Sequence, residues 1–555
     1  METTQLPPKR FRDETEVSGD ATSSPSKRSR EEPHDTPEGS SNTDACGPMP
    51  AASHTPGGPP NGKQKSKKAD VWAFGRKGKR DRWRQDAQVR AAAESGIGFD
   101  GDLGNAPRSD PNELKKERLP KKKCVMLIGF CGAGYNGMQI QNDCEGAKTI
   151  EGSLFEALVK AGGVSEDNSD DSTKVAFARA ARTDAGVHAA CNAISLKLIT
   201  QIPSLVEAGV ELVSHINTFL PPEIRVWDIV RTNNNFKSCN SRVYEYLFPS
   251  YMLMPPFPSS ALAKTVNRVN KELTLPPLEP PWDLPLEPPE HEILDEIRRS
   301  FRASIEDITR VRLLLKKYEG THNFHNYTIG RDFVDNSSKR YMINIDVRGP
   351  RVYDGLEWIS LRFHGQSFML HQRKMVGLVI LAARTRTSPN LIVKTFEQTR
   401  IHVPKAPALG LLLEQPQFGV YNKKVEESNE HVRTSTSKTG SEQGHKGNLS
   451  RNDIIRDVID LEKHREIIDE FKVRMIYSRM REEDTKSHIF SQWVSFIDSY
   501  PGPDFEYLNA GGVITEAAIQ KKGVQRDTAF KEPVESGAND VDENTLDLKS
   551  AETDG

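Results

Sequence analysis

Hydrophobic residues between about 121 and 510 recur with two different periods, and the period changes from one segment to the next. Alternation at every second position, or a short apolar run between polar turns, predicts β-strands. Strands are predicted over 123–130, 174–180, 193–199, 224–230, 242–248, 341–347 and 357–363. Spacings of three and four residues predict helices. Helices are predicted over 149–163, 204–220, 293–315, 368–384 and 451–482, and the apolar segment 489–497 is expected to pack back onto the core.

These strands and helices recur in two successive blocks, each large enough to form one layered α+β unit. The segments outside the blocks are rich in Ser, Pro, Gly and charge, and have too few aliphatic residues to bury a core. The predicted parts are a disordered basic and polar tail, 1–120; an N-terminal half that contains Asp184, 121–254; a Pro-rich insertion, 255–290; a C-terminal half, 291–422; a linker, 423–450; a C-terminal helical extension packing on the core, 451–510; and a disordered tail, 511–555.

The formal net charge of −2 conceals an uneven distribution of charge. Residues 61–90 hold 11 Lys and Arg against 3 Asp, with Trp72, Phe74 and Trp83 among them. A basic run with interleaved aromatic rings is typical of contact with an RNA backbone, although a solvated tail explains it equally well. Two short basic clusters, 7–12 and 26–30, are of the nuclear-import type and predict a nuclear location, with cytosolic and mitochondrial forms left open.

Cysteine usage and hydropathy exclude several classes of protein. Six cysteines in 555 residues, none spaced as C-x-x-C, argue against a disulfide framework and against a Cys-rich zinc site. No run of 18 apolar residues exists and the N-terminus lacks an apolar signal region, which predicts an intracellular, soluble protein without a membrane segment.

The stretch ARTDAGVHA, 181–189, combines a carboxylate with turn residues and follows a predicted strand. Gly186 favours a positive φ and Asp184 accepts hydrogen bonds from its own backbone in turns, so a purely structural role is one interpretation. The other is chemical: the carboxylate would lie at the end of a sheet, and Arg182 is near enough in sequence to keep it ionised.

Seven stretches together carry a resemblance to a known family. They are GYNGMQIQ (134–141), ARTDAGVHA (181–189), INTFLPPEIRV (216–226), SRVYEYLF (241–248), YEGTHNFHNYT (318–328), GQSFMLHQRKMVG (365–377) and APALGLLL (406–413). In this order they resemble the signature motifs of the TruA-type pseudouridine synthases, and most of all the eukaryotic tRNA pseudouridine synthase 1 group. The resemblance spans about 121–422, and 451–500 is similar to the extra C-terminal helix of that group.

The resemblance implies a fold and an activity. The expected fold is α+β, with two similar halves whose mixed, mainly antiparallel sheets join around a central basic RNA-binding cleft. The expected enzyme is an isomerase that breaks the N1–C1′ bond of a uridine flipped out of its stack, turns the base and rejoins it through C5. The substrate would be tRNA in the anticodon stem and loop region, with small nuclear RNA and messenger RNA as further candidate substrates. The protein is expected to be a monomer that also binds the nuclear import machinery.

The resemblance also assigns candidate residues. Asp184 would act as nucleophile at C1′ or as base at the sugar, and these two roles stay open. Arg182 would hold Asp184 charged or fill the space of the flipped base, Tyr244 would stack on uracil and transfer a proton at C5, and Arg373 would pair with Asp184. The expected substrate-binding residues are Gln139, Gln141, Leu411 and Leu413.

No cofactor is expected, because the isomerisation involves no redox step and no external group. A structural zinc ion is implied only by resemblance to relatives described as zinc-containing. His322 and His325 lie three residues apart, but neither Cys nor a carboxylate cluster accompanies them. We therefore interpret them, and His188, as hydrogen-bonding residues and assign no metal ligands.

The chain departs from the family pattern at Gln372–Arg373, where the apolar residue between Gln and Arg is missing. In a helix one missing residue turns everything downstream by about 100°. A bulge, a shifted helix start or an error in the gene model would each account for it, and Lys374 is the alternative cation. This departure keeps one rival function open, a catalytically impaired RNA-binding or RNA-chaperone protein on the same fold. A scaffold that recruits partners through its Pro-rich insertion and tails is a second rival.

Overall fold

The structure is a computed structural model that describes residues 119–141, 146–234, 236, 238–279, 284–439, 455–521 and 530. The chain divides into a unit Met1–Glu113 and a unit Leu114–Gly555, and all described residues belong to the second. The basic segment 61–90, the two import-type clusters and almost all of the predicted N-terminal tail therefore lie outside the described residues.

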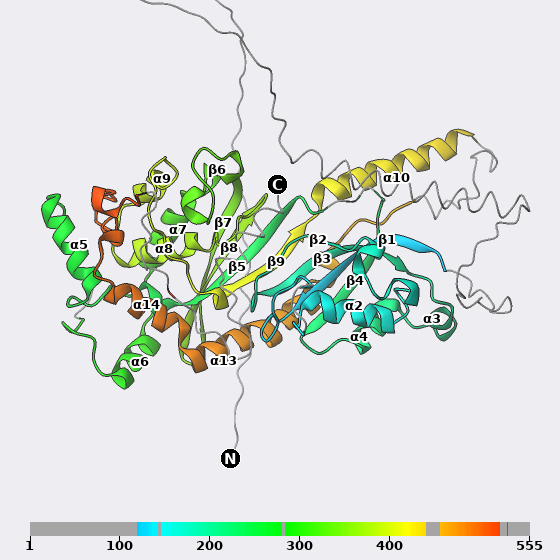
Figure 1. Cartoon of the computed structure of the whole chain (residues 1–555), viewed down its shortest axis with the longest axis horizontal. Coiled ribbons are helices and arrows are strands. Elements are labelled where there is room, and N and C mark those ends of the chain that lie inside the picture. The colour runs from blue at the N-terminus through cyan, green and yellow to red at the C-terminus, as the bar shows by residue number, and fades with distance from the viewer. Residues whose placement is uncertain are drawn as a thin grey trace, which may run out of the picture. The chain divides into compact units, whose positions relative to one another are not determined.

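A nine-stranded sheet forms the centre of the fold (Figure 1). Its strands are β1 (Lys121–Phe130), β2 (Ala178–Arg179), β3 (His188–Ile199), β4 (Ile224–Arg231), β5 (Ser241–Pro249), β6 (Gly320–Asn323), β7 (Lys339–Tyr353), β8 (Leu356–Gly365) and β9 (Leu411–Gln417). The order is β4-β1-β3-β9-β5-β8-β7-β6, and β2 pairs with β3. The predicted α+β class and mixed, mostly antiparallel sheet are confirmed.

Strand β9 connects the early strands with the late ones. It runs parallel to β3, with His188 opposite Leu412, and antiparallel to β5, with Tyr244 opposite Leu413. The other described strand pairs are antiparallel. Because β9 lies between β3 and β5, residues at the start of β3 come close to Tyr244 although they lie far apart in the sequence.

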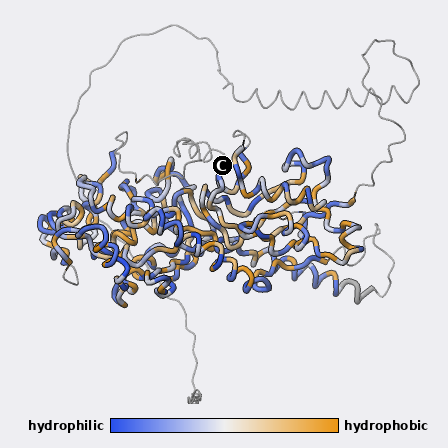
Figure 2. Tube along the Cα trace, turned by 90° about the horizontal axis from the view of Figure 1, so that it is seen from below, coloured by the Kyte–Doolittle hydropathy of each residue, from blue (hydrophilic) through white to orange (hydrophobic). Residues whose placement is uncertain are grey.

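Helices flank this sheet. They are α2 (Ile150–Lys160), α3 (Pro203–Ala208), α4 (Leu212–Thr218), α5 (Ala261–Glu272), α6 (His291–Ser300), α7 (Ile305–Lys316), α8 (Lys374–Arg384), α9 (Asn390–Lys394), α10 (Gly419–Thr439), α12 (Arg465–Phe471), α13 (Ser478–Ser487) and α14 (Ile489–Ser499). Helices α2 and α4 pack with β1, β3 and β4 around one hydrophobic cluster, and α7, α8 and the C-terminal helices share a second. Hydrophobic and hydrophilic residues alternate at short intervals along the trace (Figure 2), as amphipathic elements require.

Two predicted helices are each divided in two. The helix over 204–220 breaks at Gly209, which has φ +66° and ends α3, with the Val210 N–H bonding to the Leu205 carbonyl. The helix over 293–315 breaks after Ser300. Ser304 then starts α7 through reciprocal hydrogen bonds with Asp307, a capping box that the sequence already contained.

The strand predicted over 174–180 is reduced to two residues. Asp171 accepts from the Thr173 N–H and starts a 3₁₀ turn over Ser172–Val175, and Ala176 adopts a left-handed φ of 52°. Only Ala178 and Arg179 remain extended, paired with Ser195 and Ile194 of β3. Local side-chain hydrogen bonding overrides the alternating pattern here.

The predicted linker over 423–450 is wrong in its first part, because α10 extends to Thr439. The helix predicted over 451–482 begins only at about Glu462, since the described residues just before it, 455–461, are not helical. Asn422 and Asn429 of α10 explain this: each side chain both donates to and accepts from one backbone residue, Ile459 and Arg456 respectively. These bonds replace the helical ones.

Two further expectations need correction. The insertion over 255–290, expected to be extended, contains α5, which Ser260 caps and whose Leu262 and Val266 are buried. The tail predicted over 511–555 begins too early, since Ala518 is buried, Ile519 bridges to Ile401 and the Gln520 N–H bonds to the Arg400 carbonyl. Most residues after 521 lie outside the described part.

The C-terminal helices pack firmly on the rest of the molecule. Trp493 of α14 is fully buried and donates its indole N–H to the Lys405 carbonyl at 2.7 Å. The buried Arg384 of α8 donates two hydrogen bonds to the Asp498 carboxylate, with nitrogen–oxygen distances of 2.6 and 2.9 Å. The apolar segment 489–497 is thus part of the core. No helix in the described part of the chain is long and apolar enough to cross a membrane.

Candidate active site

Asp184 lies in a tight turn just before β3. The Val187 N–H bonds to the Asp184 carbonyl at 3.2 Å, and Gly186 has φ +75°, which glycine adopts without strain. Thr183 is buried, whereas Arg182 and Asp184 on either side of it are exposed. The turn therefore presents the arginine and the carboxylate outward while their neighbours anchor the loop.

The Gly-rich turn after β1 supports this loop by direct backbone contact. A side chain on Gly132 would lie 2.2 Å from the Val187 carbonyl oxygen, and one on Gly137 would meet the Thr183 carbonyl at 3.3 Å. The Met138 N–H bonds to Thr183 and the Gly186 N–H bonds to Tyr135, both through carbonyls. Gly132 and Gly137 therefore allow the backbone after β1 to pack closely against the Asp184 turn.

His188 completes the anchor beneath the turn. It is 1% exposed, and its Nδ1 accepts the Gly132 N–H at 3.0 Å. Burial lowers the pKa of His188 to about 4, with a further contribution from the charge of Arg479. A neutral ring that accepts from the backbone fits the hydrogen-bonding role expected from the sequence.

Tyr244 lies across β9 from the start of β3, on strand β5. Burial is the main cause that raises the pKa of Tyr244 to about 12; the charge of Arg242 acts to lower this pKa and the charge of Asp184 acts to raise it. At neutral pH the hydroxyl keeps its proton and can donate it. The Phe368 ring packs edge-on against Tyr244, with centroids 4.7 Å apart.

The segment that precedes α8 is a turn, so the helix predicted over 368–384 is wrong for its first residues. Helix α8 begins at Lys374, with Arg373 in the capping position, and His371 has a left-handed φ of 61°. The residue missing at Gln372–Arg373 therefore falls outside the helix and does not turn α8 about its axis. Arg373 is 8% exposed, and its pairing with Asp184 stays a prediction.

A buried ion pair ties α2 to the strand that leads into the Asp184 turn. Glu151 is 1% exposed and pairs with Arg179 of β2, and its second oxygen accepts the Ile140 N–H at 3.1 Å. Burial raises the pKa of Glu151, against the effect of Arg179. The neighbouring Gln139 and Gln141 are exposed, and Gln141 donates to the Asn136 carbonyl at 2.9 Å.

The remaining candidates lie within the packed sheet or near it. Leu411 is half-buried and Leu413 fully buried on β9. His322 bonds to the Glu319 carbonyl at 2.8 Å and stacks on Phe396 with centroids 4.2 Å apart, so its ring already has partners other than a metal. Among the described residues, no three His, Cys, Asp or Glu side chains gather as ligands of a metal ion.

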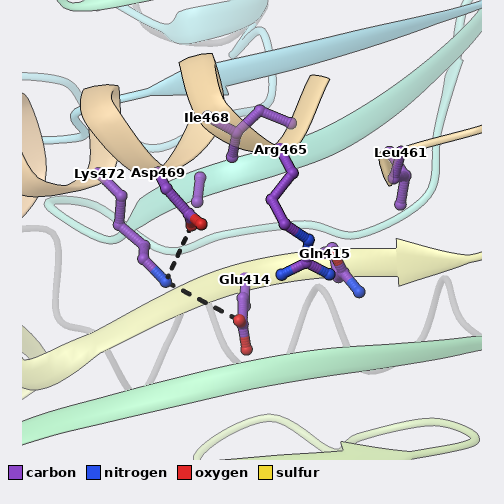
Figure 3. Close-up of a pocket in the computed structure, with 8 residues that line it drawn as sticks. Glu414, Gln415, Leu461, Arg465, Ile468, Asp469 and Lys472 are labelled. Atoms are coloured by element: carbon purple, nitrogen blue, oxygen red, sulfur yellow. Dashed lines mark ion pairs between the residues drawn. The ribbon is translucent and has the colours of Figure 1, made fainter. Parts of the chain in front are cut away.

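A network of buried charges lies behind the site, on the other face of β5. Tyr244 and Glu245 are consecutive, so their side chains point to opposite faces of the sheet. Glu245 accepts both Tyr477 at 2.8 Å and Ser360 at 2.6 Å, and Lys472 lies 3.3 Å from it. Figure 3 shows Lys472, beside α12, reaching Glu414 of β9 and Asp469, each at 3.8 Å.

This network keeps Glu245 charged. Burial alone would raise its pKa, but the ammonium of Lys472 and the hydroxyls of Ser360 and Tyr477 outweigh that, and the pKa lies below its ordinary value. None of these residues was predicted from the sequence. Phe368 and Arg242 were not predicted either, although both lie inside motifs that carry the resemblance.

Comparison with known proteins finds relatives that are RNA-modifying enzymes, isomerases named for making pseudouridine. The sequence model of the tRNA pseudouridine synthase family matches residues 314–419. The tRNA pseudouridine synthase 1 of Yarrowia lipolytica is 38% identical over 452 residues, which cover 72% of this chain and 78% of that protein. That of Schizosaccharomyces pombe is 33% identical, covering 80% and 98%. A tRNA pseudouridine(27/28) synthase of Saccharomyces cerevisiae is 35% identical, covering 66% and 97%.

This chain is therefore a member of the tRNA pseudouridine synthase family, of the TruA type. Its activity is the conversion of uridine in tRNA to pseudouridine. The resemblance noted on the sequence motifs is confirmed.

Proposed function

We propose that Asp184 is the catalytic residue of this synthase. One observation supports the proposal above all: an exposed carboxylate stands in an anchored turn just before β3, and Tyr244 lies across β9 from the start of that strand. In this position the carboxylate can attack C1′ of a flipped uridine or remove a proton from its sugar, and both roles remain in the proposal. The base leaves its stack to reach it.

We assign supporting roles to three neighbours. Arg182, exposed beside Asp184, holds the carboxylate charged or fills the space of the extruded base. Tyr244, protonated at neutral pH, stacks on uracil and transfers the proton at C5. Arg373, at the start of α8, pairs with Asp184. Gln139, Gln141, Leu411 and Leu413 are proposed to contact the nucleotide.

The RNA is proposed to cross a basic cleft between two α+β halves. The two hydrophobic clusters, one around α2 and β1 and one around α7, α8 and β8, support a division into halves. Burial, together with the charges of Lys405 and Arg400, lowers the pKa of Lys374 to about 8, and Lys374 directly follows Arg373 at the start of α8. Such a cluster suits an RNA backbone.

We propose uridines of the anticodon stem and loop as targets, and small nuclear and messenger RNA as further substrates. The Saccharomyces relative is named for positions 27/28 of tRNA, which supports the first part. The proposal includes no cofactor for the chemistry and no resident metal. It also includes a nuclear location, based on the basic clusters at 7–12 and 26–30.

The test is to incubate the full-length protein with tRNA, small nuclear RNA and messenger RNA transcripts, and to map pseudouridine in each. Asp184→Ala is the control, with RNA affinity measured in parallel. We expect the wild type to modify specific uridines and Asp184→Ala to modify none while it still binds RNA. Identical maps for the two proteins would overturn the role of Asp184, and an unmodified wild-type tRNA map would favour the RNA-binding rival.

A further inference from the structure

Arg242 of strand β5 contacts the backbone that leads into both loops of the candidate site. It lies two residues before Tyr244, so strand alternation puts both side chains on the same face of the sheet. Its register partner on β8 is Gly365, the last residue of that strand. Arg242 is half-buried.

In the part of the chain that the structure describes, the guanidinium donates three hydrogen bonds, all of them to main-chain carbonyl oxygens. Its Nε and Nη2 donate to the Ala180 carbonyl at 3.0 and 2.6 Å, and its Nη1 donates to the Gln366 carbonyl at 3.2 Å. Within the described residues no carboxylate lies at ion-pair distance from Arg242. The side chain thus holds two pieces of backbone from distant parts of the sequence.

The two carbonyls are the points at which ordered strands become the loops of the site. Ala180 follows β2, is fixed by its own N–H bond to the Ala193 carbonyl at 2.8 Å, and leads directly into Arg182 and Asp184. Gln366 follows β8, is fixed by its N–H bond to the Tyr341 carbonyl at 3.0 Å, and leads into the segment with Phe368 and Arg373.

The geometry of arginine suits this task better than that of any other cation. A guanidinium is planar and presents its donors in a rigid fork, so it fixes the distance and the angle between two acceptors at once. A lysine ammonium is a point donor on a flexible stem. Arg242 and the carbonyls of Ala180 and Gln366 together form the Arg242 clamp.

We infer that Arg242 is a positioning residue, whose fork sets the spacing between the Asp184 loop and the Phe368–Arg373 segment on either side of Tyr244. The inference rests on the proposed role of Asp184. Because catalysis depends on reacting groups held at near-contact geometry, a shift of about 1 Å in one loop is enough to slow the reaction by about 100-fold. RNA affinity, which comes from many backbone contacts, depends little on this spacing.

The experiment compares Arg242→Lys with the wild type in single-turnover conversion of tRNA, with RNA affinity and thermal unfolding measured on the same preparations. We expect the rate constant to fall by about 100-fold, tRNA affinity to stay within about three-fold, and the protein to remain folded at the assay temperature. Arg362→Lys is the matched control: Arg362 is a half-buried arginine of β8 that pairs with Glu414. It should lose stability and keep its rate.

A rate within about three-fold of wild type in folded Arg242→Lys would overturn the clamp. An equal loss of rate in Arg362→Lys would also overturn the clamp, because the loss would then come from a general destabilisation of the sheet. Should Arg242→Lys fail to fold, Arg242→Gln, whose amide reaches one carbonyl at most, gives the same decision. Asp184→Ala run alongside separates the two hypotheses: its retained activity would overturn the proposed function, whereas the Arg242 variants alone decide the clamp.

Discussion

The two faces of β5 are built in opposite ways. On the Tyr244 face, the Asp184 turn is held by backbone hydrogen bonds, by glycines that allow close approach and by one arginine that reaches only carbonyls. On the Glu245 face, side chains hold one another: Lys472, Tyr477 and Ser360 surround a buried carboxylate. On the first face Arg182 and Asp184 remain exposed to solvent. On the second face Glu245 and Lys472 are buried and pair with each other.

This difference separates chemistry from stability along a single strand. A buried charge is costly to leave unpaired, so the Glu245 face responds to substitution through the free energy of unfolding. An exposed charge contributes little to folding, so on the proposed role of Asp184 we expect its substitution to change the rate rather than the stability. The C-terminal extension, which follows the last of the seven family motifs, supplies Lys472 and Tyr477 to the buried face and thereby contacts β5 and β9.

The largest effect on stability is expected at Lys472. Lys472→Met leaves the Glu245 carboxylate buried with hydroxyl partners only, which should cost about 3 kcal/mol of unfolding free energy. Equilibrium denaturation would measure it. Adding Glu245→Gln to Lys472→Met should recover most of the loss, and Arg474→Met, at an exposed arginine of the same segment, should change little. Equal losses at Lys472 and Arg474 would contradict the contrast between the faces.

The next effect depends on pH and concerns His188. Its folded pKa is lowered to about 4, so the unfolded state binds the proton more readily between pH 6.5 and pH 4. The stability contribution is complete above pH 6.5 and is lost as the pH falls, by about 2.5 kcal/mol at pH 4.5. The difference in unfolding free energy between wild type and His188→Asn should shrink by that amount on acidification. A difference independent of pH would contradict a buried neutral ring.

The smallest effects come from two glycines of the Asp184 loop region. Gly132→Ala places a methyl group against the Val187 carbonyl and should cost about 2 kcal/mol and lower the rate. Gly186→Ala has open space around it and meets only the strain of a positive φ, about 1 kcal/mol. Denaturation and single-turnover assays on both variants compare the effect of a steric clash at Gly132 with the effect of backbone strain at Gly186. A larger loss at Gly186 would show that conformation, not contact, holds the turn.

Much of the fold could be predicted from the sequence because its strands alternate clearly. The strands β1, β4, β5 and β8 lie where the pattern places them, and α2 begins at the expected residues. The two predicted helices are divided at Gly209 and Ser304 by local capping, and hydrophobic periodicity alone does not predict such helix ends. Strand β9 was recognised only as a motif, since its seven residues include a proline and show no alternation.

The site was predictable in part, for a different reason. Asp184, Arg182 and Tyr244 lie in motifs whose residue types suggest chemistry. Arg242 acts through carbonyl oxygens, which carry no signature in a sequence. Lys472 and Glu245 meet only because the C-terminal helices fold back on the sheet, so their pairing depends on tertiary structure. No periodic pattern reports a contact between residues so far apart.

The most direct test of the account is the single-turnover rate of Asp184→Asn on tRNA, with enzyme in excess and the unfolding transition measured on the same sample. Loss of the carboxylate charge at an exposed position should slow pseudouridine formation by about 1,000-fold or more and leave the unfolding midpoint unchanged. A rate within about ten-fold of wild type would contradict the account, because the chemistry would then have to come from another group.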